Sequence, residues 1–395
     1  MKACGIVVEY NPFHNGHYYH LQQAKNQTNA DCMIAVMSGN FLQRGEPALL
    51  SKWERAKCAL MGGADLVVEL PYPFATAHAP LFAKGSISLL HALRADAVCF
   101  GSEAGNIDLF YQTIEFLSDH KDTYEQAIKS FAAKGYSYPK AASLAFETIS
   151  SGESLLDLTK PNNILGFEYV KTIVEESYHM KAETIKRMGA GYHDLDVTKG
   201  QIASATGIRN MIFSQAAAID ELRDFVPLGT YAILKSADRL LNWEAFFPFL
   251  QYRVLSSSPE ELKQIYEMEE GLEYRLKNVM KDAENFQSFM HAFKTKRYTW
   301  TRLQRLCLHL LNNVKKQEIK PLLAGKPPYI RILGMSKTGQ AYLHQVKKKL
   351  ELPLVTSISK FDHPMLELEK KVSSIYALVH PSPIVTNEYG PPIQA

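Results

Sequence analysis

Nearly continuous apolar runs alternate with helix-like segments over the first hundred residues. The runs cover residues 3–9, 31–37, 65–70 and 97–101. The segments between them carry apolar side chains at helical spacing and cover residues 18–25, 52–61 and 83–93. Strands that are apolar throughout are typical of parallel sheets with helices on both faces. With right-handed crossovers, the pattern predicts a doubly wound, Rossmann-like α/β domain.

The pattern becomes mainly helical after about residue 220. Before that point, further helix-like spacing and one more strand-like run cover residues 107–149, 164–174, 182–187 and 204–211. Beyond it, aromatic-rich helical segments dominate, such as WEAFFPFLQY at 243–252. We therefore predict two domains, an α/β domain at 1–220 and a mainly helical domain at 221–395. Residues 329–357 are an exception, because they fit a late βαβ unit.

Composition narrows the class of protein. The chain has 395 residues, of which 46% are hydrophobic and 22% charged, and its net charge is only +3. No apolar run reaches the eighteen or so residues that cross a bilayer, and the N-terminus lacks the long apolar region of a signal peptide. The five cysteines are scattered and include no Cys-x-x-Cys pair, which argues against disulfides and zinc. We expect a cytoplasmic protein with reduced cysteines, no membrane contact and no metal site of its own.

Two histidines flank a glycine directly after the first predicted strand. The loop contains His14, Gly16 and His17, preceded by Asn11 and Pro12, which suit a turn. A phosphate can approach the backbone at Gly16, and a helix expected to begin near His17 would offer unpaired N–H groups. Imidazole donors suit the charge that develops on an attacked phosphate. A phosphate site is the favoured interpretation, and a pair of turn histidines bonded to backbone is the alternative.

A second candidate phosphate loop lies at residues 204–209. Ser204 and Thr206 are hydroxyl residues at an expected helix start, where capping alone explains them. Arg209 follows one turn later and can bind phosphate through its two-pronged guanidinium, which capping does not require.

Longer strings make a specific resemblance. GIVVEYNPFHNGH, MSGNFLQRGEPA, GADLVVELP and KPNNILGFEY resemble the tRNA(Met) cytidine acetate ligases of the nucleotidyltransferase superfamily. The resemblance implies a nucleotidyltransferase-type fold and two steps. Acetate attacks the α-phosphate of ATP to give acetyl-adenylate, and the wobble cytidine of elongator tRNA(Met) then takes the acetyl group. It also implies that Mg²⁺ enters with ATP and that no covalent nucleophile is needed.

The resemblance also assigns residues to the nucleotide. His14 and His17 are the catalytic candidates from the charge argument for the loop. The resemblance implies ATP contacts from Val7, Val8, Glu9, Tyr10, Asn11, Pro12, Phe13, His14, Asn15, Gly16, His17, Tyr18, Tyr19, His20, Gly101, Asn162, Arg187 and Met188. Ser204, Thr206 and Arg209 join this set through the second loop. Asn162 is open to a second interpretation as a simple helix cap, and Arg187 as a surface ion pair.

A small anion such as acetate needs a cation or an amide near the phosphate site. Asn40, Gln43 and Arg44 follow the second predicted strand and are the candidates, with a solvent-exposed polar loop as the alternative.

A basic stretch in the predicted helical domain is the candidate RNA contact. Glu318 is the only acid between residues 294 and 326, and Tyr298 and Trp300 lie among the basic residues. The predicted tRNA contacts are Lys294, Lys296, Arg297, Arg302, Arg305, Lys315 and Lys316. The apolar face formed by Leu303, Leu306 and Leu310 predicts that Arg302 and Arg305 point away from the core. A solvated helix face is the alternative to phosphate binding.

Two other functions fit parts of the sequence. An adenylyltransferase acting on a small phosphorylated cofactor precursor would use the same histidine loop but needs no large basic region. A noncatalytic tRNA-binding protein would hold ATP only as a ligand. No protein partner is evident.

Overall fold

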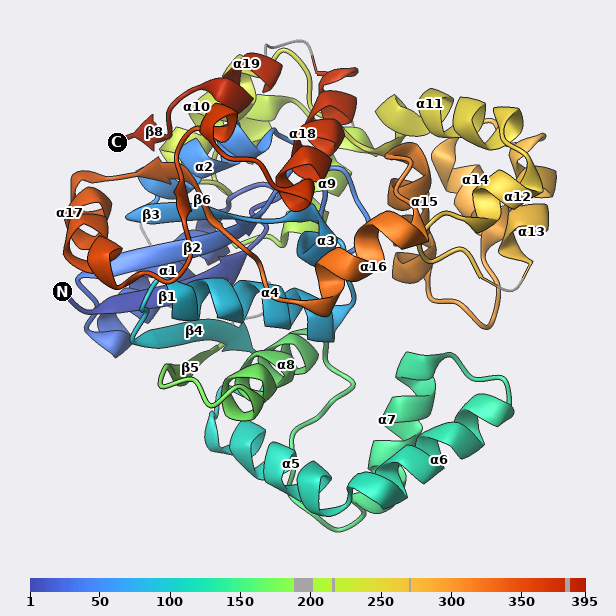
Figure 1. The fold of residues 1–395 in the computed structure, drawn as a ribbon, viewed down its shortest axis with the longest axis horizontal. Coiled ribbons are helices and arrows are strands. Elements are labelled where there is room, and N and C mark those ends of the chain that lie inside the picture. The colour runs from blue at the N-terminus through green and yellow to red at the C-terminus, as the bar shows by residue number, and fades with distance from the viewer. Residues whose placement is uncertain (188–201, 215–216, 270, 381–383) are drawn as a thin grey trace.

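A mixed sheet forms the centre of the molecule (Figure 1). The structure is a computed structural model, and it describes residues 1–187, 202–214, 217–269, 271–380 and 384–395. Its strands follow the order β5-β4-β1-β2-β3-β6-β7, with β8 also paired to β6. The strands are β1 Ala3–Val8, β2 Cys32–Ser38, β3 Leu66–Leu70, β4 Ala97–Ser102, β5 Lys181–Lys186, β6 Ile330–Met335, β7 Leu354–Val355 and β8 Ile393–Gln394.

The first five strands are parallel, as predicted. The chain runs outward from β1 through β2 to β3 and then returns to place β4 and β5 on the other side of β1. The strand order therefore reverses between β1 and β4. Ligands of doubly wound sheets bind at this switch point, beyond the carboxyl ends of the strands.

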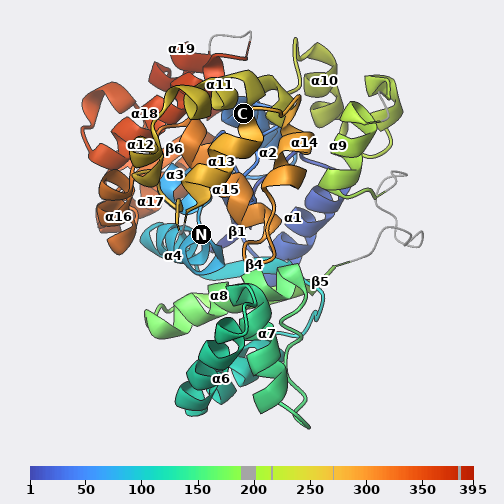
Figure 2. The same ribbon diagram turned by 90° about the vertical axis from the view of Figure 1, so that its right-hand side faces the viewer.

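Helices cover both faces of the sheet. The first half of the chain contributes α1 Asn15–Thr28, α2 Lys52–Met61, α3 Tyr72–Ala75, α4 Ala79–Ala92, α5 Asp108–Asp119, α6 Lys121–Ala133, α7 Tyr138–Ile149, α8 Pro161–Glu175 and α9 Ala205–Phe213. Figure 2 shows α1 and α4 on opposite sides of the sheet. β1, β2 and β3 are almost fully buried, because both of their faces carry apolar side chains under helices. The predicted doubly wound fold is confirmed.

The second half of the chain begins with a helical cluster. α10 Leu228–Ser236 packs on α2, and the cluster follows with α11 Trp243–Ser256, α12 Pro259–Lys263, α13 Leu272–Met280, α14 Phe286–Phe293 and α15 Trp300–Leu311. α16 Lys316–Ala324 then returns to α3. An aromatic core holds the cluster together, with Trp243 stacked on Phe286 at 4.3 Å between ring centroids. α11 to α15 stand together beside the sheet (Figure 1).

The last part of the chain returns to the sheet. β6 pairs antiparallel with β3, α17 Lys337–Val346 follows, and β7 and β8 both pair parallel with β6. The late βαβ unit is therefore present, but it extends the N-terminal sheet instead of standing apart. β6 covers the edge of β3, which would otherwise expose unpaired backbone groups. α18 Pro364–Ala377 and α19 Ile384–Tyr389 complete this part. The predicted boundary between two domains at residues 220 and 221 stays a prediction. Residues 330–394 were assigned to the mainly helical domain, but their strands join the sheet of the N-terminal part.

Candidate active site

The loop from β1 to α1 is anchored by backbone-directed hydrogen bonds. The Asn11 Oδ1 accepts from the Leu49 N–H at 2.7 Å, and the Glu9 Oε1 accepts from the Gln43 N–H at 2.8 Å. Arg55 is fully buried and donates to the carbonyl oxygens of Glu9, Leu50 and Ser38. This arginine, which the sequence did not single out, therefore ties the loops after β1 and β2 together.

The two histidines cap the first helix. α1 begins at Asn15, earlier than predicted, because the Nδ1 of His14 accepts from the Gly16 N–H at 3.0 Å and the Nδ1 of His17 accepts from the His14 N–H at 3.3 Å. The Asn15 N–H donates to the carbonyl oxygen of Phe225 at 3.0 Å. The prediction that this helix start offers unpaired N–H groups is therefore wrong for these amides. The hydrogen-bonding pattern of the alternative interpretation is present, and a phosphate contacting Gly16 N–H must displace the His14 ring.

The histidines of the loop are held neutral. Burial, and then the charge of Arg187, lowers the pKa of His14 to about 3 and that of His20 to about 4. The pKa of His17 also lies well below its usual value, through burial, His14, Arg187 and His20. The rings of His14 and His17 stack at 3.7 Å between centroids. Neutral imidazoles can donate one N–H each, but they bring no positive charge to the site.

Arg187 supplies that charge from across the switch point. It follows β5, and its N–H donates to the Ser102 carbonyl oxygen at 2.8 Å. A Cβ on Gly101 would come within 3.2 Å of the Arg187 Cγ, so glycine at 101 leaves room for the arginine. The predicted residues Gly101, Arg187 and the histidine loop are therefore brought together. Met188 lies outside the residues that the structure describes.

Asn162 lies at the start of α8, and its side chain is hydrogen-bonded to Glu103. The Asn162 Nδ2 donates to the Glu103 Oε1 at 2.7 Å, and the Asn163 N–H donates to the Glu103 Oε2 at 2.8 Å. The Asn163 Oδ1 in turn accepts from the N–H groups of Glu103 and Ala104. The end of β4 and the start of α8 are thus locked, with an acidic side chain at a helix N-terminus where it is favourable.

The second loop reaches the first one through Arg209. Its Nη1 donates to the Asn11 carbonyl oxygen at 2.8 Å, and its Nη2 pairs with the Glu46 Oε2 at 2.9 Å. Ser204 caps α9 by accepting from the Gly207 N–H at 3.0 Å, and the Thr206 Oγ1 lies 3.5 Å from Arg209. Arg209 is therefore at the site, although in this state Glu46 balances its charge.

Three buried polar atoms of the loop and helix have no hydrogen-bond partner among the described residues. They are the Tyr10 Oη, the Asn11 Nδ2 and the His20 Nε2. A buried polar group without a partner is unfavourable by about 1–3 kcal/mol. Partnerless buried atoms also occur elsewhere in the described chain, for example at Thr230 and Tyr329, so these three atoms do not by themselves define a ligand site.

The acetate candidates differ in their surroundings. Asn40 is buried, its Oδ1 accepts from the Lys52 N–H at 2.8 Å, and its Nδ2 lies 3.4 Å from the Ser373 Oγ. Gln43 is partly buried and Arg44 is exposed. The structure gives Asn40 an internal role, and the acetate assignment of all three residues stays a prediction.

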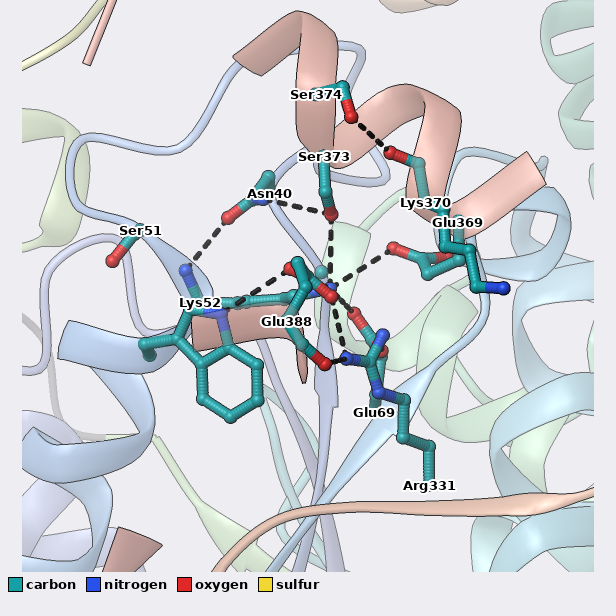
Figure 3. A network of polar contacts seen from close by, with 12 residues as sticks. Asn40, Ser51, Lys52, Glu69, Arg331, Glu369, Lys370, Ser373, Ser374 and Glu388 are labelled. Atoms are coloured by element: carbon teal, nitrogen blue, oxygen red, sulfur yellow. Dashed lines mark hydrogen bonds and ion pairs between the residues drawn. The ribbon is translucent and has the colours of Figure 1, made fainter. Parts of the chain in front are cut away.

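A buried ionic network lies under the loop that follows β2 (Figure 3). The Lys52 Nζ lies 2.6 Å from the Glu69 Oε1 and 2.8 Å from the Glu388 Oε1. Arg331 bridges the second oxygens of the same two carboxylates at 2.8 and 2.6 Å. Burial and the charge of Glu69 raise the pKa of Glu369 to about 8. Two cations therefore balance two carboxylates, with Glu369 as the protonated fifth member near neutral pH.

The predicted RNA contacts do not form one exposed surface. Lys296 and Arg297 are exposed, whereas Lys294, Lys315 and Lys316 are partly buried, and the Lys316 Nζ donates to the Met268 carbonyl oxygen at 2.6 Å. Arg302 lies over the Tyr298 ring at 4.3 Å. The prediction that Arg305 points away from the core is wrong. Arg305 is 7% exposed and its Nε pairs with the Glu267 Oε1 at 3.2 Å, so this partner makes burial of the charge possible.

The described residues contain no membrane-spanning helix and no metal-binding cluster. No described helix is long and apolar enough to span a membrane. Within the same residues, no three His, Cys, Asp or Glu side chains are grouped to hold a metal ion. All five cysteines are buried and free.

The sequence matches the model of a known family. Residues 1–389 match the HIGH Nucleotidyl Transferase family. The chain is 48% identical over 401 residues to the tRNA(Met) cytidine acetate ligase of Bacillus subtilis, covering 99% of this chain and 96% of the relative. It is 50% identical over 392 residues to the protein of the same name from Halalkalibacterium halodurans, covering 97% and 94%.

Solved structures share the whole fold. The crystal structure of Thermotoga maritima TmcAL bound with alpha-thio ATP superposes with a TM-score of 0.88 at 33% identity, covering all of both chains. The apo form of the same protein gives a TM-score of 0.89 at 34% identity, covering 100% of this chain and 99% of that one.

Proposed function

The chain belongs to the HIGH Nucleotidyl Transferase family, and we propose that it is an ATP-dependent ligase that joins acetate to a cytidine of tRNA(Met). The relatives that match it over almost their whole length are named for this reaction. Elongator tRNA(Met) is the substrate and its wobble cytidine is the target. These substrates place the reaction in the cytoplasm.

The chemistry has two steps. A carboxylate oxygen of acetate attacks the α-phosphate of MgATP, which forms acetyl-adenylate and releases pyrophosphate. The exocyclic amine of the cytidine then attacks the acetyl carbonyl carbon, which forms the amide and releases AMP and a proton. Acetate itself is the nucleophile of the first step, so no side chain needs to form a covalent bond. Positioning and charge stabilisation provide the acceleration.

The observation that carries the proposal is that Arg187 lies near His14 and His17 at the switch point between β1 and β4, while Arg209 is bound to the backbone of the same loop. His14 and His17 lie at the N-terminus of α1, Arg187 approaches them over Gly101, and Arg209 binds the same loop through Asn11. Neutral imidazole N–H groups and two guanidinium groups are suited to the negative charge that develops on the α-phosphate. The partnerless atoms of Tyr10, Asn11 and His20 provide further donors for the nucleotide.

The test is radioactive exchange of pyrophosphate into ATP by the full chain, first with acetate alone and then with a tRNA(Met) transcript and nucleoside analysis. Acetate-dependent exchange followed by acetylcytidine in the tRNA supports the proposal. Exchange that needs a phosphorylated cofactor precursor instead of acetate would favour an adenylyltransferase. Tight tRNA binding without any exchange would favour a noncatalytic binding protein.

A further inference from the structure

Helices α6 and α7 form a hairpin that projects from the body of the molecule (Figure 1). α6 buries none of its residues, and the two helices pack chiefly on each other. α5 leads into the hairpin from the end of β4, and residues 150–160 lead out of it to α8. The hairpin is therefore inserted between Gly101 and Asn162, two segments of the candidate active site.

The tip of the hairpin is basic. Lys129, Lys134 and Lys140 are all exposed. No acidic residue occurs between Glu125 and Glu147 in the sequence. Lys134 and Lys140 have no acid within six positions in the sequence, whereas Lys129 lies one helical turn after Glu125.

The tip also presents aromatic side chains to solvent. Tyr138 is 70% exposed and Tyr136 is 45% exposed. Lys134 lies over the Phe131 ring at 5.1 Å, and the edge of that ring faces Tyr136 at 6.3 Å. Gly135, at φ +84, makes the tight turn that places these groups together. Exposed rings on a small hairpin add little to folding, and their position among lysines indicates a partner.

We propose that the α6–α7 tip, defined by Lys129, Lys134, Tyr136, Tyr138 and Lys140, is an RNA-binding surface that holds unpaired nucleotides of the tRNA substrate. The lysines neutralise phosphates and the two tyrosines stack on bases, the combination by which proteins hold single-stranded nucleic acid. The proposal rests on the proposed function, because that function supplies the RNA. Another copy of the chain is a poorer partner, since two basic tips repel.

The hairpin is placed to act together with the helical cluster. Both stand on the same side of the sheet in Figure 1, and the view from that side in Figure 2 shows both toward the reader. The exposed Lys296 and Arg297 belong to the connection between α14 and α15 of that cluster. We therefore expect one RNA to contact the cluster and the hairpin at once.

The test compares three full-length variants with the wild type. The first is Lys129→Glu/Lys134→Glu/Lys140→Glu, and the second is Tyr136→Ala/Tyr138→Ala. The third is a matched charge control, Lys57→Glu/Lys337→Glu/Lys360→Glu, which reverses three exposed lysines elsewhere on the surface. Affinity for a tRNA(Met) transcript and for its isolated anticodon stem-loop is measured at several salt concentrations, beside acetate-dependent pyrophosphate exchange without RNA.

We expect the hairpin lysine variant to lose roughly tenfold or more in RNA affinity, with a salt slope smaller by about 0.7 for each lost contact to a phosphate of an unpaired nucleotide. The tyrosine variant should lose roughly fivefold or more with little change in slope. The control should lose clearly less than the first variant, and exchange without RNA should stay normal in all three. RNA affinity equal to the control in both hairpin variants would overturn the proposal, as would a loss of self-association in their place. Absence of exchange in the wild type would count against the proposed function alone, because RNA binding is measured separately.

Discussion

The imidazole rings of His14 and His17 are stacked at 3.7 Å between centroids, and each ring accepts a backbone N–H of the loop that it belongs to. The same two side chains that are placed for phosphate chemistry therefore also close the first turn of α1. Replacing either residue removes a cap as well as a donor, so stability and catalysis must be measured separately.

His14→Ala and His17→Ala should each lower acetate-dependent pyrophosphate exchange by roughly 100-fold or more, the usual effect of losing a donor to developing charge. His14→Asn is the matched control for the cap, because asparagine is among the best N-cap residues. It should restore thermal stability but not exchange. Tight tRNA binding should persist in all three variants. Near-normal exchange in an alanine variant would show that its histidine has no catalytic role.

The parallel sheet and the histidine loop were predictable because their signals are local. Each strand is an uninterrupted apolar run, and the predicted bounds of β1 to β5 agree with the structure within one residue at each end. The backbone bonds of the two histidines were the alternative interpretation and not the favoured one, because histidine is not an ordinary capping residue, although its Nδ1 can accept a hydrogen bond.

The remaining features depend on partners that are distant in the sequence. Arg331 and Glu69 are 262 positions apart, and only the antiparallel pairing of β6 with β3 brings them together. Arg305 was predicted to be exposed from the spacing of the leucines on its helix. That spacing cannot reveal that Glu267, 38 positions away, is buried beside it. Sequence patterns predicted the elements well, but they could not predict which charges are paired inside.

Stability should fall as the pH decreases below about 6.5, because the buried His20 stays neutral in the folded state. Its pKa of about 4 lies below the ordinary value of 6.5, so between these values the unfolded chain binds the extra proton. A His20→Gln variant should remove up to about 1.4 kcal/mol per pH unit of this dependence. Urea unfolding of both proteins between pH 7.5 and 4.5 measures it. Identical slopes would mean that His20 is protonated in the folded protein.

Two glutamates of the buried network should respond differently to the same substitution. Glu388 faces both Lys52 and Arg331; burial opposes its ionisation, but these two charges lower its pKa to about 2. Glu388→Gln leaves buried positive charge uncompensated and should destabilise the fold by about 3–5 kcal/mol. Urea midpoints at neutral pH measure the loss.

Glu369→Gln is the matched comparison, because glutamine resembles the protonated acid. The pKa of Glu369 is raised from its ordinary value of 4.5 to about 8 in the folded protein. Between pH 4.5 and pH 8 the folded protein therefore binds a proton that the unfolded chain does not bind. The stability that this proton contributes is lost as the pH rises through this range. The variant should be close to the wild type at pH 6 and relatively more stable at pH 9. An equal loss of stability in both variants would show that Glu369 is ionised.

The basic residues near α15 should separate into those that bind RNA and one that holds the fold. Lys296 and Arg297 are exposed, so Lys296→Glu/Arg297→Glu should weaken tRNA binding and reduce the salt slope by up to about 1.8, with exchange from acetate and ATP intact. Arg305→Ala strands the buried carboxylate of Glu267 and should lower the free energy of unfolding by about 3–5 kcal/mol while leaving the salt slope unchanged. Filter binding at several salt concentrations and urea unfolding of both variants make the distinction. A reduced salt slope for Arg305→Ala with normal stability would return this residue to the RNA surface.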